Sequence, residues 1–261
     1  MAWTDIRDGN PLKRRLQHGE TLLGCFQRIP APEVTEVCAA AGFDFVVVDL
    51  EHTLMTEEHA AGVVRAAEAA GIPALVRVPS HDPATIGRLL EAGPSGLHVP
   101  QVRSAAEAEA AVRATRYSPE GSRGLSTPRQ SGYGGRMSLA EYVRASADWT
   151  LLVIQVEDRS GLDEVEAIAA VEGVDAVFIG LTDLSQDLGV PGAYDDLALQ
   201  DAVDRAFRLI KGRGKAAAVP VTGRAMAEEY LARGATYLTA NDTRLLLEGG
   251  RAFVRALRGS A

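Results

Sequence analysis

The chain of 261 residues has very few lysines and cysteines. Only three lysines, Lys13, Lys211 and Lys215, stand among its 27 basic residues, so arginine carries almost all of the positive charge. The two cysteines, Cys25 and Cys38, lie within an expected strand and an expected helix and lack the spacing of a zinc site. We therefore expect reduced, buried thiols, as in a cytoplasmic protein.

The chain also lacks an excess of positive charge and any long apolar run. Its formal net charge is −8, which argues against partners such as nucleic acid or an anionic membrane, because both bind basic surfaces. No stretch approaches the roughly 18 consecutive apolar residues that predict a membrane span. The amino-terminal sequence has no apolar segment of the kind found in a signal peptide.

Eight apolar, β-branched runs alternate with helical segments along the chain. The expected strands are residues 21–26, 43–50, 73–78, 95–102, 150–157, 175–180, 215–221 and 236–241. The expected helices are residues 32–41, 56–70, 83–92, 105–115, 161–170, 196–213, 224–233 and 244–257. Such alternation predicts a parallel sheet. Eight units in a chain of this length predict an α/β fold, the eight-stranded TIM barrel, as a single domain over residues 1–261.

A doubly wound open sheet is the main alternative, because it uses the same alternation of strands and helices. Such a sheet usually has a glycine-rich phosphate loop after its first strand. Residues 24–32, GCFQRIPAP, do not form such a loop, and so the barrel is favoured.

One segment, residues 117–149, interrupts the repeat and is rich in Gly, Ser, Pro and Arg. So long a connection in a compact domain is usually functional or disordered. We expect it to be an active-site or subunit-contact loop with one helix near residues 139–146.

In a TIM barrel the reactive groups gather at the carboxyl ends of the strands. Asp49, Glu51 and His52 follow the second expected strand, and Arg77 ends the third. His52 could act as a general base near neutral pH, and Arg77 could meet a carboxylate of the protein or of a substrate. For both residues a purely structural role stays open. A structural role is expected for the remaining histidines, His18, His59, His81 and His98.

Two further carboxylates, Glu157 and Asp183, follow the fifth and sixth expected strands, about one βα unit apart. Neighbouring strand ends in a barrel bring such side chains within reach of one ion. Two carboxylates together with waters suit Mg²⁺ or Mn²⁺, which prefer oxygen ligands. The alternative for Glu157 is a surface ion pair with Arg159.

No lysine stands at an expected strand end. Schiff-base chemistry requires a desolvated lysine in the site. If the barrel acts on carbonyl compounds, we therefore expect it to use a metal ion instead of an imine.

Several segments, taken together and in order, resemble the HpcH/HpaI aldolase family of metal-dependent class II pyruvate aldolases. They include GFDFVVVDLEHT (42–53), IQVED (154–158) and VEGVDAVFIGLTDLSQDLG (171–189). The resemblance covers nearly the whole chain and implies a TIM barrel. It also implies a homo-oligomer, a hexamer or a trimer, with the C-terminal helix exchanged between subunits.

By this resemblance, Glu157 and Asp183 would bind one divalent metal ion, Mg²⁺, Mn²⁺ or Co²⁺. Gln155 would orient the substrate or a metal-bound water. The backbone N–H groups around Thr182 would receive the substrate carboxylate. The implied substrate-binding set is Gln155, Gly180, Leu181, Thr182 and Asp183.

The catalytic set that the resemblance implies is Asp49, Glu51, His52, Arg77 and Glu91. His52 would be the base, supported by the two acids beside it, and Arg77 would contact the 2-oxo acid. Glu91 occupies a position where the family often has an aspartate. In the assembled protein that aspartate comes from a neighbouring subunit and pairs with the base.

The implied reaction is the reversible cleavage of a 4-hydroxy-2-oxo acid to pyruvate, or a related 2-oxo acid, and an aldehyde through a metal-stabilised enolate. Leu181, Pro220, residues 125–135 and residues 240–243 depart from the family pattern, which predicts an unusual acceptor or donor substrate. Two alternatives remain. One is a lyase for acyl-CoA thioesters, with the arginine-rich residues 123–136 contacting the nucleotide, and the other is a non-catalytic barrel that binds 2-oxo acids.

Overall fold

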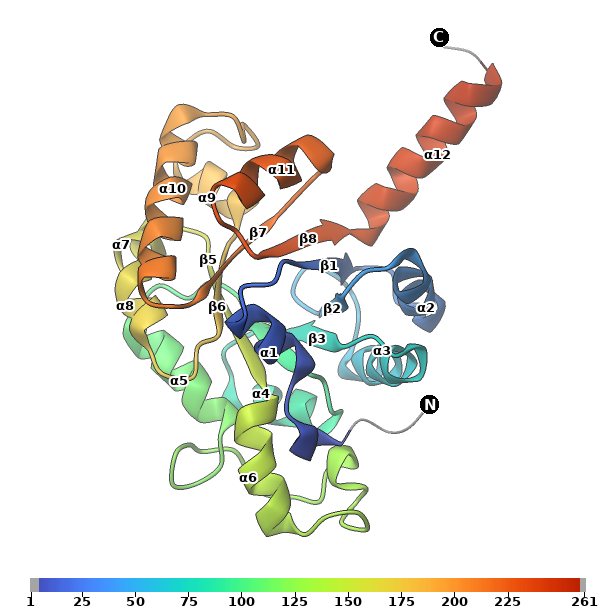
Figure 1. Ribbon diagram of the computed structural model, residues 1–261, viewed down its shortest axis with the longest axis vertical. Coiled ribbons are helices and arrows are strands. Elements are labelled where there is room, and N and C mark those ends of the chain that lie inside the picture. The colour runs from blue at the N-terminus through green and yellow to red at the C-terminus, as the bar shows by residue number, and fades with distance from the viewer. Residues whose placement is uncertain (1–4, 259–261) are drawn as a thin grey trace.

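The computed structural model describes residues 5–258, which form a closed barrel of parallel strands (Figure 1). Each strand pairs with the next one along the chain, and β8 pairs with β1 to close the barrel. The strands are β1 (Leu22–Gln27), β2 (Phe45–Asp49), β3 (Ala74–Arg77), β4 (Gly96–Val99), β5 (Leu151–Val156), β6 (Ala176–Ile179), β7 (Ala216–Pro220) and β8 (Tyr237–Asn241). The predicted TIM barrel is confirmed. Residues 1–4 and 259–261 of the predicted domain lie outside the described residues.

Helices follow the strands and surround the barrel (Figure 1). They are α1 (Pro11–Gln17), α2 (Pro32–Ala41), α3 (Glu57–Ala70), α4 (Pro83–Glu91), α5 (Ala105–Thr115), α6 (Leu139–Trp149), α7 (Arg159–Asp163), α8 (Val165–Ala170), α9 (Leu181–Asp187), α10 (Leu197–Gly212), α11 (Arg224–Ala232) and α12 (Asp242–Arg258), with 3₁₀ turns η1 (Ile6–Asp8) and η2 (Arg129–Ser131). The expected helix over residues 161–170 is divided into α7 and α8. The sequence patterns missed α1 and α9, which are short.

Local sequence explains where the helices begin and end. The Thr56 hydroxyl accepts from the His59 N–H, and the His59 ring accepts from the Thr56 N–H, so the two residues form a capping box at the start of α3. Gly42 ends α2 with a φ of 90°, a left-handed conformation that glycine adopts without steric cost. The next strand can therefore begin after a very short turn.

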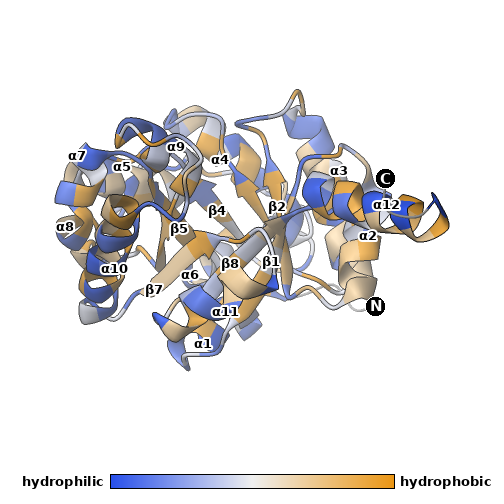
Figure 2. Ribbon diagram, turned by 90° about the horizontal axis from the view of Figure 1, so that it is seen from above, coloured by the Kyte–Doolittle hydropathy of each residue, from blue (hydrophilic) through white to orange (hydrophobic). Residues whose placement is uncertain are grey.

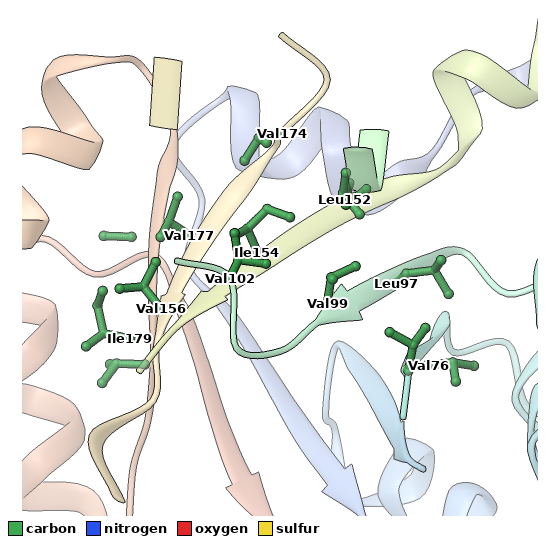
Figure 3. Packing of buried hydrophobic residues seen from close by; sticks show 14 of the residues in the cluster. Val76, Leu97, Val99, Val102, Leu152, Ile154, Val156, Val174, Val177 and Ile179 are labelled. Carbon is green, nitrogen blue, oxygen red and sulfur yellow. The ribbon is translucent and has the colours of Figure 1, made fainter. Parts of the chain in front are cut away.

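Two layers of buried apolar side chains hold the barrel together. One layer fills the barrel interior, and Leu12 of α1 belongs to it. The other lies between strands and helices and includes Val76, Val99 and Ile154 (Figure 3). Because both faces of the sheet are covered, every residue of β2 and β5 is buried.

The last helix, α12, projects away from the barrel instead of packing along it (Figure 1). Only its first residue, Asp242, is buried. Leu246, Phe253 and Leu257 are 68%, 67% and 72% exposed, and Figure 2 shows apolar and polar residues along the helix. Within residues 5–258, no helix is both long and apolar enough to span a membrane.

Residues 117–149 pack at the amino-terminal ends of the strands. The indole N–H of Trp149 donates to the Pro94 carbonyl at 3.1 Å, and the Gln130 amide donates to the Gly93 carbonyl at 3.2 Å. Both acceptors precede β4, so the segment lies opposite the end where reactive groups were expected. Within one chain the segment therefore does not lie near the active site, and the expectation of an active-site loop is corrected. Its aromatic residues Tyr117, Tyr142 and Trp149 are buried in a separate apolar cluster, which holds the segment at this end of the barrel. Its role as a subunit contact stays a prediction.

Candidate active site

A cavity of about 410 Å³ opens at the carboxyl ends of the strands. Every predicted site residue except Glu51 and Glu91 lines it. Phe26, Arg28 and Phe178 also line it, and sequence reasoning missed all three. A second cavity, of about 430 Å³, lies at the amino-terminal end of the barrel and contains none of the predicted residues.

Asp49 and Arg77 form a buried ion pair at the ends of two adjacent strands. The register of β2 and β3 places the two residues side by side. Arg77 donates from Nε and Nη2 to both carboxylate oxygens of Asp49, at 2.9 and 2.7 Å. Burial acts to raise the pKa of Asp49, but the hydrogen bonds and charge of Arg77 outweigh it and hold that pKa below its usual value. The pair is therefore ionised, and it fixes the guanidinium at the cavity wall.

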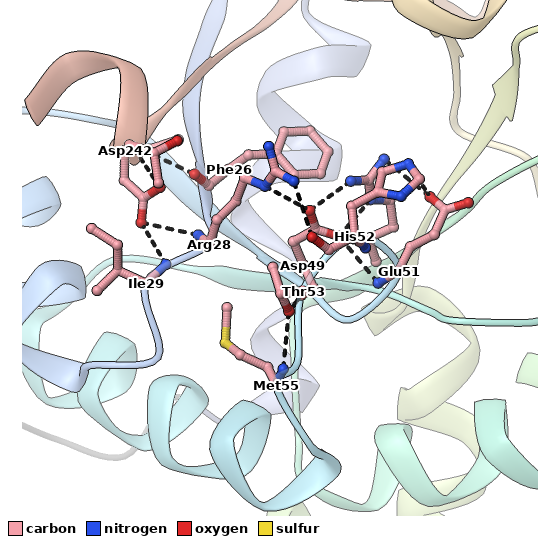
Figure 4. Close-up of polar contacts among 12 residues, drawn as sticks. Phe26, Arg28, Ile29, Asp49, Glu51, His52, Thr53, Met55 and Asp242 are labelled. Atoms are coloured by element: carbon pink, nitrogen blue, oxygen red, sulfur yellow. Dashed lines mark hydrogen bonds and ion pairs between the residues drawn. The ribbon is translucent and has the colours of Figure 1, made fainter. Parts of the chain in front are cut away.

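Glu51 and His52 follow in a tight turn (Figure 4). Their backbone N–H groups both donate to Asp49 Oδ1, at 3.1 and 3.2 Å. Glu51 Oε2 lies 3.1 Å from Arg77 Nη1 and 3.6 Å from His52 Nε2. Within residues 5–258 this buried oxygen forms the ion pair with Arg77 but no hydrogen bond, so it can also accept a hydrogen bond from the imidazole of His52. The side chain of His52 is 46% exposed and is open to a substrate.

Glu157 lies directly after β5, and its carboxylate is buried. The backbone N–H of Gln101 donates to Oε1 at 2.7 Å, and the Gln155 amide lies 3.5 Å from Oε2. Gln101 has a φ of 55°, which is uncommon for a residue with a side chain and often marks a functional site. Its side-chain amide also donates to Glu51 Oε1 at 2.8 Å. Gln101 therefore links the two acids.

Burial and two neighbouring acids raise the proton affinity of Glu157. Burial, followed by the charges of Glu51 and Asp183, raises the pKa of Glu157 to about 7. A divalent cation bound there would relieve this repulsion, and carboxylate oxygens are ligands that hard divalent cations prefer. Among residues 5–258 no group of three or more His, Cys, Asp or Glu could hold a metal. Glu157 and Asp183 would therefore need oxygens from water or substrate to complete a metal site.

The expected alternative for Glu157, a pair with Arg159, does not form. Arg159 Nε lies 3.6 Å from Asp187 Oδ2 instead. Glu157 thus directs its carboxylate into the cavity and not to a surface partner.

The connection from β6 to α9 forms another wall of the cavity. A Cβ atom added to Gly180 would lie 2.5 Å from Glu157 Oε2, so glycine allows the backbone to approach this acid. Leu181 is buried, and the Thr182 hydroxyl lies 3.0 Å from the Tyr194 hydroxyl. The residues predicted to bind substrate therefore lie beside the residues predicted to bind metal.

Buried polar contacts inside the barrel hold the side chain of Gln155 in place. The two ring nitrogens of His98 lie 3.1 Å from Gln155 Oε1 and 2.6 Å from the Tyr237 hydroxyl. Burial lowers the pKa of His98 to about 3, so the ring is neutral. This is the structural role expected for His98, and it orients the Gln155 amide group toward Glu157.

Glu91 lies at the other end of the barrel. It ends α4, and its carboxylate accepts from Arg123 Nη2 at 3.0 Å and from the Ser126 hydroxyl. The structure does not bring it to His52 of the same chain. A contact with His52 of a neighbouring subunit stays a prediction.

The protein is a closed parallel barrel, and its acids, a fixed arginine and an imidazole gather at the carboxyl ends of the strands. This arrangement defines an α/β-barrel enzyme that can stabilise negative charge on a bound oxygen. The chain belongs to the HpcH/HpaI aldolase/citrate lyase family, whose model matches residues 22–245. The predicted family is thereby confirmed.

Named relatives and solved structures agree with this membership. The chain is 38% identical to a hydroxypyruvate/pyruvate aldolase of Pseudomonas aeruginosa, over 97% of this chain and 94% of that protein. It is 37% identical to a 4-hydroxy-2-oxovalerate aldolase of Rhodococcus jostii, over 91% and 92%. A family member from Burkholderia cenocepacia superimposes with a TM-score of 0.90 at 33% identity, over 96% and 100%. The chain is therefore a carbon–carbon lyase, and the alternative of a non-catalytic barrel is wrong.

Proposed function

We propose that the protein is a divalent-metal-dependent aldolase that reversibly cleaves a 4-hydroxy-2-oxo acid to pyruvate, or a related 2-oxo acid, and an aldehyde. The observation that carries the proposal is the convergence of Glu157, Asp183 and Arg77 in one cavity at the carboxyl ends of the strands. The names of the two relatives, a hydroxypyruvate/pyruvate aldolase and a 4-hydroxy-2-oxovalerate aldolase, support this substrate class.

The cavity residues divide the work of binding the 2-oxo acid. When held by Glu157 and Asp183, a divalent metal ion would supply Lewis-acid stabilisation of the charge that develops on the substrate. Arg77, fixed by Asp49, places a second positive charge in the same cavity. Gln155 and residues 180–183 orient the ketone and carboxylate groups of the substrate.

His52 is the base in this proposal. It removes the proton of the C4 hydroxyl while the C3–C4 bond breaks, the aldehyde leaves, and the electron pair remains with the pyruvate fragment. The Glu51 carboxylate, 3.6 Å from Nε2 of His52, stabilises the imidazolium that results. Protonation of C3 then completes pyruvate.

We also propose a homo-oligomer, a hexamer or a trimer, in the cytoplasm. The exposed apolar side chains of α12 support an assembly, because a helix of this kind is stable when a second copy covers it. Glu91, held at the opposite end of the barrel from His52 of its own chain, would then complete a neighbour's site. The free thiols of Cys25 and Cys38 support the location.

A lyase acting on acyl-CoA thioesters is less well supported. Arg123 pairs with Glu91, and Arg129 pairs with Glu68. These contacts hold the arginine-rich segment at the amino-terminal end of the barrel. Within one chain it therefore offers no nucleotide contact at the cavity.

Exchange of the pyruvate methyl protons with D₂O tests the proposal directly. NMR should show exchange with Mg²⁺, Mn²⁺ or Co²⁺, loss of exchange in EDTA, and recovery when metal is restored. Glu157→Gln should lose metal binding and exchange, whereas Glu228→Gln, at an exposed position on α11, should keep both. The proposal fails if the metal-loaded protein shows no exchange, or if Glu157→Gln retains it. A panel of aldehydes with pyruvate then identifies the second substrate.

A further inference from the structure

We propose that Arg28 forms a second anion site in the cavity and selects aldehydes that carry a negatively charged group. Arg28 directly follows β1 and lines the same cavity as His52 and Arg77. The inference rests on the aldolase activity proposed above and specifies the substrate class on its aldehyde side.

The backbone of Arg28 is held by an acid from the neighbouring strand end. Asp242 Oδ2 accepts from the N–H groups of Arg28 and Ile29, at 2.9 Å each (Figure 4). Asp242 is buried and directly follows β8, which pairs with β1. Arg28 therefore stands on a fixed part of the barrel rim.

The side chain of Arg28 has few partners of its own. Nη2 donates to the His52 carbonyl at 3.0 Å, and Nε lies 3.4 Å from Asp49 Oδ2. Both oxygens of Asp49 already accept shorter bonds from Arg77. Within residues 5–258 the guanidinium has no further acceptor, although it carries five N–H donors. Its side chain is 37% exposed, so the remaining donors are open to a ligand.

The charges of the cavity indicate what that ligand is. The positive charge of Arg77 is balanced by two carboxylates, Asp49 and Glu51. Arg28 has only one carboxylate nearby, Asp49, and shares it with Arg77. In the proposed reaction the carboxylate of the 2-oxo acid is held by residues 180–183. A second anion at Arg28 must then come from the other substrate, the aldehyde. Carboxylates and phosphates both bind a guanidinium through paired hydrogen bonds, so either group satisfies the site.

Two matched pairs of aldehydes test this site. The kcat/KM for addition to pyruvate is measured for butanal and succinic semialdehyde, and for glyceraldehyde and glyceraldehyde 3-phosphate. Arg28→Gln should lower kcat/KM for an anionic member by roughly 10- to 100-fold, as expected for a lost charged hydrogen bond, and for its neutral match by less than about threefold. Arg28→Lys should recover part of the loss. A loss confined to one pair identifies the carboxylate or the phosphate as the anion.

Proton exchange into pyruvate separates the two proposals, because it requires no aldehyde. Arg224→Gln, in which an exposed arginine of α11 is replaced, serves as the matched control. If the unaltered protein exchanges protons but Arg28→Gln lowers kcat/KM equally for neutral and anionic aldehydes, the proposed anion site is wrong and the aldolase proposal stands. If the unaltered protein shows no exchange with metal, the aldolase proposal fails and this inference fails with it.

Discussion

Arg77 donates to both carboxylate oxygens of Asp49, at 2.9 and 2.7 Å, and this buried pair joins the ends of β2 and β3. Asp49→Asn should destabilise the fold by about 3–5 kcal/mol, because it leaves a largely buried guanidinium without its main partner. The same change should reduce proton exchange into pyruvate, since Arg77 loses its fixed position. Urea unfolding and NMR exchange measure the two effects.

A matched control for this prediction is an exposed ion pair. Glu166→Gln breaks the pair with Arg213, whose side chains are both about half exposed, and should change the free energy of unfolding by less than about 1 kcal/mol. Equal effects of the two substitutions would contradict the importance assigned to the Asp49–Arg77 pair.

Gly180→Ala should weaken metal binding with little loss of helix or strand content. The added Cβ would lie 2.5 Å from Glu157 Oε2 and 2.7 Å from its Cβ, so the proposed metal ligand must move. We expect Mn²⁺ affinity to fall by at least about tenfold, measured by calorimetry, because ligand geometry must be held closely. Gly62→Ala is the control: Gly62 lies within α3, and its added Cβ meets no atom within 4 Å. That variant should bind Mn²⁺ normally and gain roughly 0.5–1 kcal/mol of stability.

Glu157→Gln should stabilise the metal-free protein in a pH-dependent way. The pKa of Glu157 is raised from 4.5 to about 7, so the unfolded chain releases this proton at lower pH than the folded protein does. The protonated carboxyl therefore stabilises the fold below about pH 4.5, and this contribution is lost as the pH rises through about 7. Glutamine cannot ionise, so the advantage of the variant should grow from near zero to on the order of 3 kcal/mol above about pH 8.

Urea unfolding in EDTA across this pH range measures that advantage. Glu228→Gln, which replaces an exposed carboxylate on α11, is the matched control. A constant difference for Glu157→Gln would show that the fold does not raise the pKa of Glu157.

The barrel and much of the site could be predicted because both follow from order along the chain. Asp49, Arg77 and Glu157 each stand at the end of an apolar run, and the parallel topology alone then brings them to one end of the barrel.

The features that sequence reasoning missed depend on backbone conformation or on distant contacts. Gln101 reaches Glu157 because its φ is 55°, which no pattern signals for glutamine. Arg28 is positioned by Asp242, more than two hundred residues away along the chain. The position of residues 117–149 was also missed, since composition indicates a long connection but not the end of the barrel against which it packs.

Disruption of the apolar side of α12 should dissociate the proposed oligomer. Leu246, Phe253 and Leu257 recur at spacings that place them near one side of the helix, and all three are exposed in the single chain. Leu246→Glu combined with Phe253→Glu should reduce the mass measured by light scattering, whereas Glu248→Gln, which alters only the ion pair with Arg244, should not. The dissociated protein should keep its circular dichroism but lose aldol cleavage, because Glu91 of a neighbour would no longer reach His52. If cleavage persists in a monomer, Glu91 has no part in the site, and if the mass is unchanged, α12 does not hold the subunits together.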